Sequence, residues 1–223
     1  MVPLTHSDDF PAASTLVGGE APLVRVVRSA LTAVPEQRIV VATTPAVADG
    51  ARDCLRAAGL GTAVVVAGEP GSRYQVIRAA LEHLGADPHT SASVLVCDHR
   101  FPLSPGDVAE RVLTALGDGH DAVVPTLPVT DTVKTVDHLG SVLSTVDRSG
   151  LQTAQYPRGF TASVLWQLVS ASPVSGPTDV DEFEAALRAG FDIGTVVGDV
   201  NAFHVELPRD AHLLDAIIAC RPD

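Results

Sequence analysis

Short runs of apolar residues alternate along the first half of the chain with longer segments whose apolar residues recur at helical spacing. The apolar runs are short enough for buried strands and lie at 38–43, 62–67, 94–97 and 122–125. The helical pattern covers 22–34, 46–58, 73–84 and 106–116. Strands that alternate with helices of this length indicate right-handed βαβ units. The pattern therefore predicts an α/β fold, with a mostly parallel sheet and helices on both faces.

The pattern changes after residue 126. Two short β-rich runs, 131–136 and 141–146, flank Asp137-His138-Leu139-Gly140, which predicts a β-hairpin. We expect this hairpin to project from the α/β body as an arm over about residues 129–150. Further helices are predicted at 161–170, 181–189 and 210–218, and further strands at 195–197 and 202–206. Thr178-Asp179 resembles an N-terminal cap and first turn.

The remaining segment, residues 5–21, is rich in Ser, Asp, Pro, Ala and Gly and shows no period, so it is predicted to be a loop. The chain has 223 residues, which is one large or two small domains, and we interpret it as a single domain over 1–223.

The strand predicted at Val94–Cys97 ends in Asp98. In an open α/β sheet the carboxyl ends of the strands border the crevice where ligands bind. An aspartate at that place is suited to hold Mg²⁺, and through it a phosphate. The alternative is that Asp98 only caps the following turn, which is an ordinary role for aspartate. The pattern leaves both interpretations open.

Charge and composition narrow the function classes. The formal net charge of −12 argues against a nucleic-acid-binding surface, although a single small nucleotide needs only a local cluster of arginines. Lys134 is the only lysine, so chemistry that requires two lysines is excluded. The three cysteines are scattered and indicate buried small hydrophobes in a reducing compartment. No signal peptide and no membrane-length apolar run is visible, so a cytoplasmic protein without a membrane partner is expected.

Four short motifs occur along the chain in the same order as in a known protein family. They are Val96-Cys97-Asp98, Asp131-Thr132-Val133-Lys134, Asp147-Arg148-Ser149-Gly150-Leu151 and Gly198-Asp199 to His204-Val205. With the second and third of these placed around a hairpin, the chain resembles the 2-C-methyl-D-erythritol 4-phosphate cytidylyltransferases of the non-mevalonate isoprenoid pathway, over roughly residues 38–220. The resemblance implies a Rossmann-like nucleotidyltransferase fold and a homodimer formed through the hairpin arm. It also implies transfer of CMP from CTP to methylerythritol phosphate, with Mg²⁺ as the cofactor.

The same resemblance implies roles for individual residues. Asp98 falls on the metal ligand, and Thr132 and Arg148, with Asp131 beside them, fall on arm positions that hold the acceptor. Gly68 and Arg73 fall near the turn that surrounds the nucleotide. Structural alternatives for these residues are a hairpin threonine, a surface arginine paired with Asp147, a turn glycine and an arginine in a first helical turn.

The departures from the family pattern fall on its catalytic groups. Where the family has a glycine-rich loop with an arginine and a lysine, residues 3–13 contain no glycine, arginine or lysine, and Asp8 and Asp9 would repel a triphosphate. The second family lysine is replaced by His204, which is mostly uncharged at neutral pH. A family arginine falls on Phe101, next to Arg100, and a family Thr-Pro-Gln reads Tyr156-Pro157-Arg158.

Two hypotheses follow. Removing one charge-stabilising donor typically costs about 10²–10³ in rate, so losing two lysines and the loop should leave little transfer activity. The chain is then a degenerate homologue with a binding or partner role. The alternative is a working nucleotidyltransferase with a rearranged site of Asp98, Arg73 and the candidate catalytic residues Arg100 and His204. It would transfer CMP or another nucleotide to methylerythritol phosphate or another alcohol phosphate.

Overall fold

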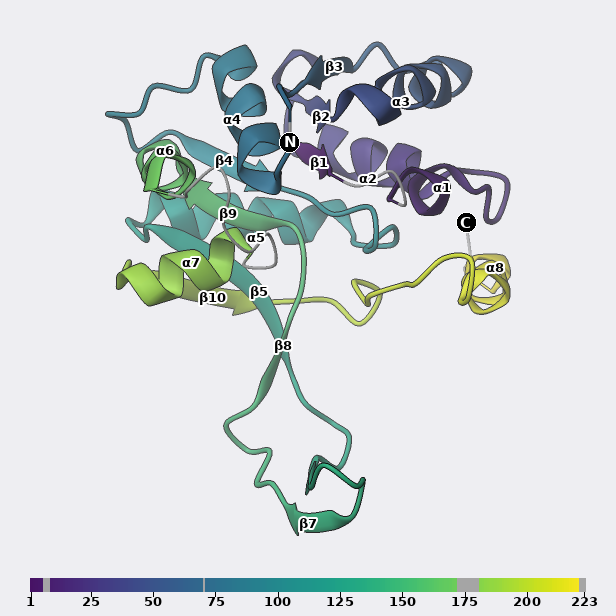
Figure 1. Cartoon of the computed structure of the whole chain (residues 1–223), viewed down its shortest axis with the longest axis vertical. Coiled ribbons are helices and arrows are strands. Elements are labelled where there is room, and N and C mark those ends of the chain that lie inside the picture. The colour runs from purple at the N-terminus through teal and green to yellow at the C-terminus, as the bar shows by residue number, and fades with distance from the viewer. Residues whose placement is uncertain (6–8, 70, 172–180, 221–223) are drawn as a thin grey trace.

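The computed structural model describes residues 1–5, 9–69, 71–171 and 181–220. Its central layer consists of two hydrogen-bonded sheets, of order β3-β2-β1 and β4-β9-β5-β10, which lie side by side (Figure 1). The join between β1 and β4 is made by the main chain of Met1, whose amino group donates to Leu95 O (2.6 Å) and whose carbonyl accepts from Cys97 N (2.9 Å). The strands are β1 (Val2–Leu4), β2 (Val40–Thr43), β3 (Ala63–Val66), β4 (Ser93–Val96), β5 (Ala122–Pro128), β9 (Arg158–Thr161) and β10 (Ile193–Val197). A short strand, β8 (Gln152–Ala154), pairs with the far end of β5.

The sheet is mostly parallel, as the sequence predicts. β1, β2 and β3 pair in parallel, and so do β5 and β10. β9 is antiparallel to both of its neighbours, β4 and β5, so these two run in the same direction. The sequence pattern missed β9 and predicted a helix from 161. The predicted helix is present as α6 (Ala162–Ala171), which begins directly after this strand.

Helices cover both faces of the sheet because alternate strand residues point to opposite sides. Val40 and Ala42 of β2 pack on one side with α4 (Arg73–Leu84), α6 and α7 (Glu182–Ala189). Val41 packs on the other side with α2 (Pro22–Leu31) and α3 (Pro45–Ala57). On that same side Leu95 and Val123 pack under α5 (Gly106–Gly117). A short 3₁₀ turn, η1 (Glu36–Arg38), precedes β2. In the described ranges no helix combines the length and apolar character needed to cross a membrane.

Two predicted segments differ from the structure. Residues 5–21 are not a plain loop, because α1 (Asp9–Ser14) lies within them and packs on α2 and α3. Residues 202–206 form no strand. Val205 N donates to Arg100 O (2.8 Å), and Val205 packs with Val17, Leu103 and α8 (Ala211–Ala219), so this segment crosses the strand ends instead of joining the sheet.

The predicted cap at Thr178-Asp179 lies outside the described residues. Within them, α7 is capped by Asp181, whose carboxylate accepts a hydrogen bond from Glu184 N (2.8 Å).

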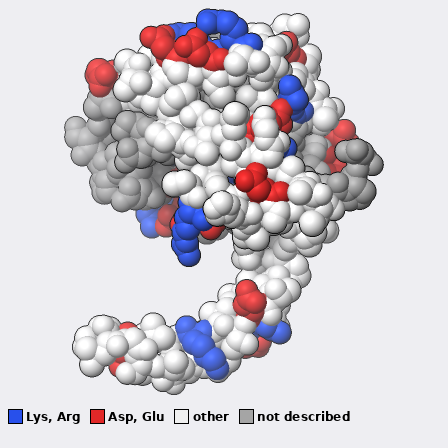
Figure 2. Space-filling model, turned by 90° about the vertical axis from the view of Figure 1, so that its right-hand side faces the viewer, with Lys and Arg blue, Asp and Glu red and all other residues white. Residues whose placement is uncertain are grey.

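The arm has the predicted hairpin. β6 (Lys134–Val136) and β7 (Val142–Thr145) pair antiparallel, and every residue of both strands is exposed. Lys134 Nζ donates to Thr145 Oγ1 (2.5 Å) across the pair. Figure 1 shows the arm extending beyond β5 and β8, and Figure 2 shows it bending to one side below the body.

Candidate functional site

Asp98 lies at the carboxyl end of β4, where its buried carboxylate is held by Arg100. Arg100 Nε donates to Asp98 Oδ1 (3.0 Å), and Nη2 donates to Oδ2 (2.6 Å). The backbone N–H of Arg100 also donates to Oδ1 (2.9 Å), which is the turn-capping arrangement expected of an aspartate here. Both carboxylate oxygens are therefore occupied from within the protein.

This arrangement does not fit Mg²⁺ bound by protein ligands. Mg²⁺ needs octahedral oxygen coordination, usually with one or two carboxylates. Asp98 faces a guanidinium at both oxygens, and the described part of the chain contains no group of three or more His, Cys, Asp or Glu side chains that could hold a metal ion. The predicted metal role of Asp98 is thus without support in the coordination geometry.

The ion pair between Asp98 and Arg100 shifts the pKa of Asp98, so its contribution to stability can be tested by changing the pH. Burial alone would raise this pKa, but the hydrogen bonds and charge of Arg100 outweigh burial and lower it to about 2 from the ordinary 3.8. A lowered pKa contributes stability above pH 4 that is lost as the pH falls toward 2, and this shift corresponds to about 2 kcal/mol. We expect the difference in unfolding free energy between the wild type and Asp98→Asn to shrink by about this amount between pH 5 and pH 2.

Urea titrations at several pH values measure this difference. The same substitution at the exposed Asp49 is the control and should stay within about 0.5 kcal/mol of wild type throughout. A difference that does not change with pH would mean that the Asp98 carboxylate is not stabilised by Arg100.

A second ion pair joins the first turns of α4 and α7. Arg73 Nε and Nη2 donate to the two carboxylate oxygens of Glu182, each at 2.8 Å. The Glu182 side chain is 0% exposed and that of Arg73 is 17% exposed. Burial alone would lower the pKa of Arg73, but the Glu182 carboxylate outweighs burial and raises it. Arg73, which was predicted to bind the nucleotide, therefore donates its guanidinium hydrogen bonds to Glu182 instead.

A third ion pair, between Arg158 and Asp181, lies beside Tyr156. The buried Arg158 guanidinium lies 4.3 Å from the Tyr156 ring centroid, also faces Phe183, and donates from Nη1 to Asp181 Oδ2 (2.5 Å). Burial and the nearby Glu182 carboxylate raise the pKa of the Tyr156 hydroxyl, while Arg158 acts against them. Tyr156 is thus neutral at physiological pH and packs between charged groups.

The three pairs, Asp98–Arg100, Glu182–Arg73 and Asp181–Arg158, form one electrically balanced cluster at the strand ends. Each arginine has a carboxylate within 2.8 Å, so the cluster supplies three positive and three negative charges. Arg73 also feels the charge of Asp98, and its own charge lowers the pKa of Asp181, which places the three pairs within electrostatic range of one another. We call this set the balanced cluster.

The other predicted body residues lie around this cluster. His204 is exposed and its ring packs edge-on against Phe101 (centroids 5.6 Å apart), while Phe101 packs in turn on Tyr156. Gly68 is exposed after β3 and has no heavy atom within 4 Å of an added Cβ, so it leaves open space at this end of the sheet.

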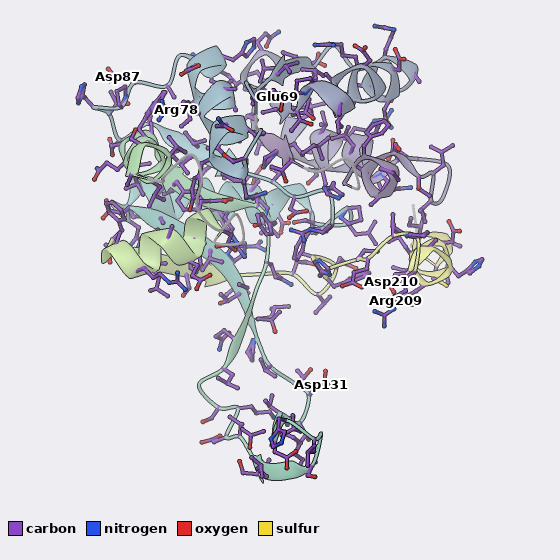
Figure 3. The ribbon with its side chains drawn as sticks, viewed as in Figure 1. Glu69, Arg78, Asp87, Asp131, Arg209 and Asp210 are labelled. Carbon is purple, nitrogen blue, oxygen red and sulfur yellow. The ribbon has the colours of Figure 1, made fainter. Side chains whose placement is uncertain are left out.

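The predicted acceptor-binding residues lie on the arm, away from the balanced cluster of the same chain. Thr132, Arg148 and Asp131 are all exposed, and Figure 3 shows Asp131 on the arm outside the body. Arg148 Nη1 donates to the carbonyl oxygen of Thr130, and Asp147 instead accepts from Ser149 N (3.0 Å). The alternative of an Arg148–Asp147 pair is therefore wrong. Within one chain, the structure does not bring the arm residues and the strand-end residues together.

Sequence reasoning missed Glu182 and Asp181, although they decide the charge of the site. Glu182 is 109 residues from Arg73 along the chain, and no local pattern signals a contact at that separation. The Tyr156-Pro157-Arg158 segment gave the one available signal, because it departs from the motif that the family carries at that position.

Comparisons with known proteins bear on this geometry. The sequence profile described as 2-C-methyl-D-erythritol 4-phosphate cytidylyltransferase matches residues 6–220. The chain belongs to this family. A relative of that name from Frankia casuarinae is 35% identical over 213 residues, covering 95% of this chain and 76% of its own length. Another from Rhodococcus jostii is 35% identical over 211 residues, with coverages of 95% and 88%.

The fold agrees with solved structures of the cytidylyltransferase family. The 2-C-methyl-D-erythritol 4-phosphate cytidylyltransferase of Thermus thermophilus superposes with a TM-score of 0.75 at 25% identity, over 98% of each chain. A 4-diphosphocytidyl-2C-methyl-D-erythritol synthase superposes with a TM-score of 0.76 at 24% identity, over 97% of this chain and 96% of its own. The Rossmann-like nucleotidyltransferase fold inferred from the motifs is confirmed.

Proposed function

We propose that this chain is a catalytically degenerate member of the cytidylyltransferase family, with a binding or partner role and weak or absent cytidylyl transfer. The observation that carries the proposal is the balanced cluster. A triphosphate requires an excess of positive charge, and transfer requires cations aimed at the charge that develops on the α-phosphorus. Arg73, Arg100 and Arg158 are each neutralised by a carboxylate of this chain.

The other residues near the carboxyl ends of the strands do not supply the positive charge that a triphosphate needs. The described residues after β1 carry no lysine or arginine before Arg25, and Lys134 lies on the arm. His204 could replace a lysine only when protonated, because a neutral imidazole carries no positive charge. Because the Asp98 carboxylate is bound by Arg100, Mg²⁺ would have to be bound by the nucleotide itself. These features support loss of the nucleotide site.

Calorimetric titration with CTP and Mg²⁺ tests this proposal. We expect no binding heat at CTP concentrations up to about 1 mM, which means that any binding is weaker than roughly −4 kcal/mol. The Frankia casuarinae relative, titrated alongside, is the control. A micromolar dissociation constant for this chain would show that the nucleotide pocket survives, and would overturn the proposal.

We further propose that the chain forms a dimer through its arm, either with itself or with a complete homologue. Support comes from the apolar side chains that the arm exposes: Val136, Leu139, Val142 and Leu143, of which Leu139 is 79% exposed. Exposed apolar residues grouped on one projecting hairpin mark a protein interaction site. No fold requirement explains them, because the described arm residues have no core to cover.

Arg148→Ala tests whether the arm keeps an acceptor-binding role. Arg148 is exposed and donates to the main-chain carbonyl of Thr130 on the same arm, so its removal should leave the fold intact. We expect affinity for methylerythritol phosphate, measured by titration, to fall about tenfold, as for loss of one charge-assisted hydrogen bond. Arg188→Ala on α7 is the control. Unchanged affinity would remove Arg148 from the acceptor site.

The second candidate function is an active nucleotidyltransferase with a rearranged site. It is favoured by the 35% identity to relatives named as cytidylyltransferases, and by the position of Asp98, Arg73, Arg100 and His204 around the same strand ends. Activity would require a substrate that displaces Asp181 or Glu182 from its arginine. A CTP-dependent release of pyrophosphate with any alcohol phosphate would select this candidate.

A further inference from the structure

β10 leaves one edge of the sheet open. It pairs with β5 on one side, and no strand lies on its other side in the described ranges. Gly198 N donates to Thr126 O (2.9 Å), and Asp192 O accepts from Ala122 N (3.1 Å), so the even-numbered residues face β5. In a parallel ladder alternate residues point their N–H and C=O to opposite sides. The main-chain groups of Ile193, Thr195 and Val197 therefore face outward.

Arg111 of α5 supports this assignment and closes one end of the edge. Its Nε donates to Val197 O (2.9 Å), which requires that carbonyl to point away from β5, and its Nη1 pairs with Asp107 (2.7 Å). A charged side chain at an edge is a common protection against unwanted strand pairing. The protection here reaches Val197 and leaves the outward N–H and C=O of Thr195 unpaired among the residues that the structure describes.

An open groove of about 650 Å³ runs between this edge and α5. It is lined by Asp107, Glu110, Arg111, Thr114, Ala115, Asp118 and the outer strand residues Thr195, Val196 and Val197. Neighbouring strands lie about 4.8 Å apart, so a further strand would occupy this groove beside β10. Val197 is 71% exposed and offers it an apolar contact.

The groove is acidic. Asp107, Glu110 and Asp118 give three negative charges against the single positive charge of Arg111, a local balance of −2. Pairing with a second copy would bring two such grooves together in a chain whose net charge is already −12. The charge therefore selects a basic occupant over a second copy of this chain.

We infer that the open edge of β10 is a docking site for an extended basic segment of a partner protein. The segment adds a strand to the sheet by main-chain hydrogen bonds to the N–H and C=O of Thr195 and to the N–H of Val197. Its arginine or lysine side chains, at alternate positions, reach Glu110 and Asp118. This site is separate from the arm and from the balanced cluster, so it stands whether or not the chain transfers nucleotides.

The experiment uses a displayed library of random ten-residue peptides selected against the full chain. The expected binders carry Arg or Lys at alternate positions and slow the hydrogen exchange of the Thr195 and Val197 amides at least tenfold. Thr195→Pro removes an outward N–H that β5 does not use, a place where edge strands tolerate proline. This variant should melt near the wild-type temperature and lose at least tenfold in peptide affinity.

A charge variant keeps the test independent of that proline. Glu110→Gln and Asp118→Asn together should weaken binding about twofold to fivefold per charge and flatten its salt dependence. The inference is overturned if the library yields no binder, or if selected peptides protect amides elsewhere in the chain. It is equally overturned if their affinity is the same for wild type, the folded Thr195→Pro variant and the charge variant.

Discussion

Glu182→Gln is expected to destabilise the fold by about 3–5 kcal/mol, because it leaves the guanidinium of Arg73 largely buried without its counter-charge. Glu182 is 0% exposed and accepts both of the hydrogen bonds that Arg73 makes to it. Glutamine has the same shape, so the loss reports the missing charge and not a cavity. Urea unfolding of wild type and variant measures the difference in unfolding free energy.

Replacing both partners separates the charge from the packing. Arg73→Met combined with Glu182→Leu should recover to within about 1–2 kcal/mol of wild type, because apolar pairs often replace buried ion pairs without large cost. Glu184→Gln, in the exposed pair with Arg188, is the control and should change stability by less than about 1 kcal/mol. A Glu182→Gln variant as stable as this control would mean that Arg73 does not depend on Glu182.

Val142→Asp combined with Leu143→Asp should weaken dimerisation at least about 100-fold, which is the effect of losing about 2–3 kcal/mol at the centre of an interface. Both side chains are exposed on β7, so charges there cost nothing in the isolated chain but must be desolvated when the arm is covered. Sedimentation equilibrium of wild type and variant over a range of concentrations measures the dissociation constant.

The control for the arm is Leu187→Asp, which places the same charge on an exposed apolar residue of α7. It should leave both the fold and the dissociation constant unchanged. A wild-type chain that stays monomeric at tens of micromolar, or an arm variant that dimerises like wild type, would contradict a dimer formed through the arm.

Local patterns were sufficient for most of the fold. The buried strands β2 and β4 and the helix α4 appear where apolar spacing predicts them, and the hairpin follows from β-rich runs around Gly140. β9 could not be predicted in this way, because Arg158 and Gly159 make up half of it and leave no continuous apolar run. Gly159 is required by tertiary packing, since a Cβ there would lie 2.5 Å from Val112 of α5.

The charge of the candidate site could not be predicted from the sequence, because it depends on which side chains pair after folding. A strand-end position can be recognised from the sequence, and Asp98 was located in that way. Whether Asp98 binds a metal or an arginine depends on Arg100, whose side chain could equally have turned toward a ligand. The partners of Arg73 and Arg158 come from the start of α7, more than 20 residues beyond either, so the neutrality of the cluster emerges only on folding.

Release of pyrophosphate from CTP, with methylerythritol phosphate and Mg²⁺ present, tests the proposed loss of transfer activity most directly. The rate for this chain should be compared with that of the Rhodococcus jostii relative under identical conditions. Loss of two donors, each typically giving about 10²–10³ in rate, predicts a rate at least about 10⁴-fold lower. A rate within about tenfold of the relative would mean that the arginines of the balanced cluster act on the nucleotide despite their carboxylates, and would contradict a degenerate site.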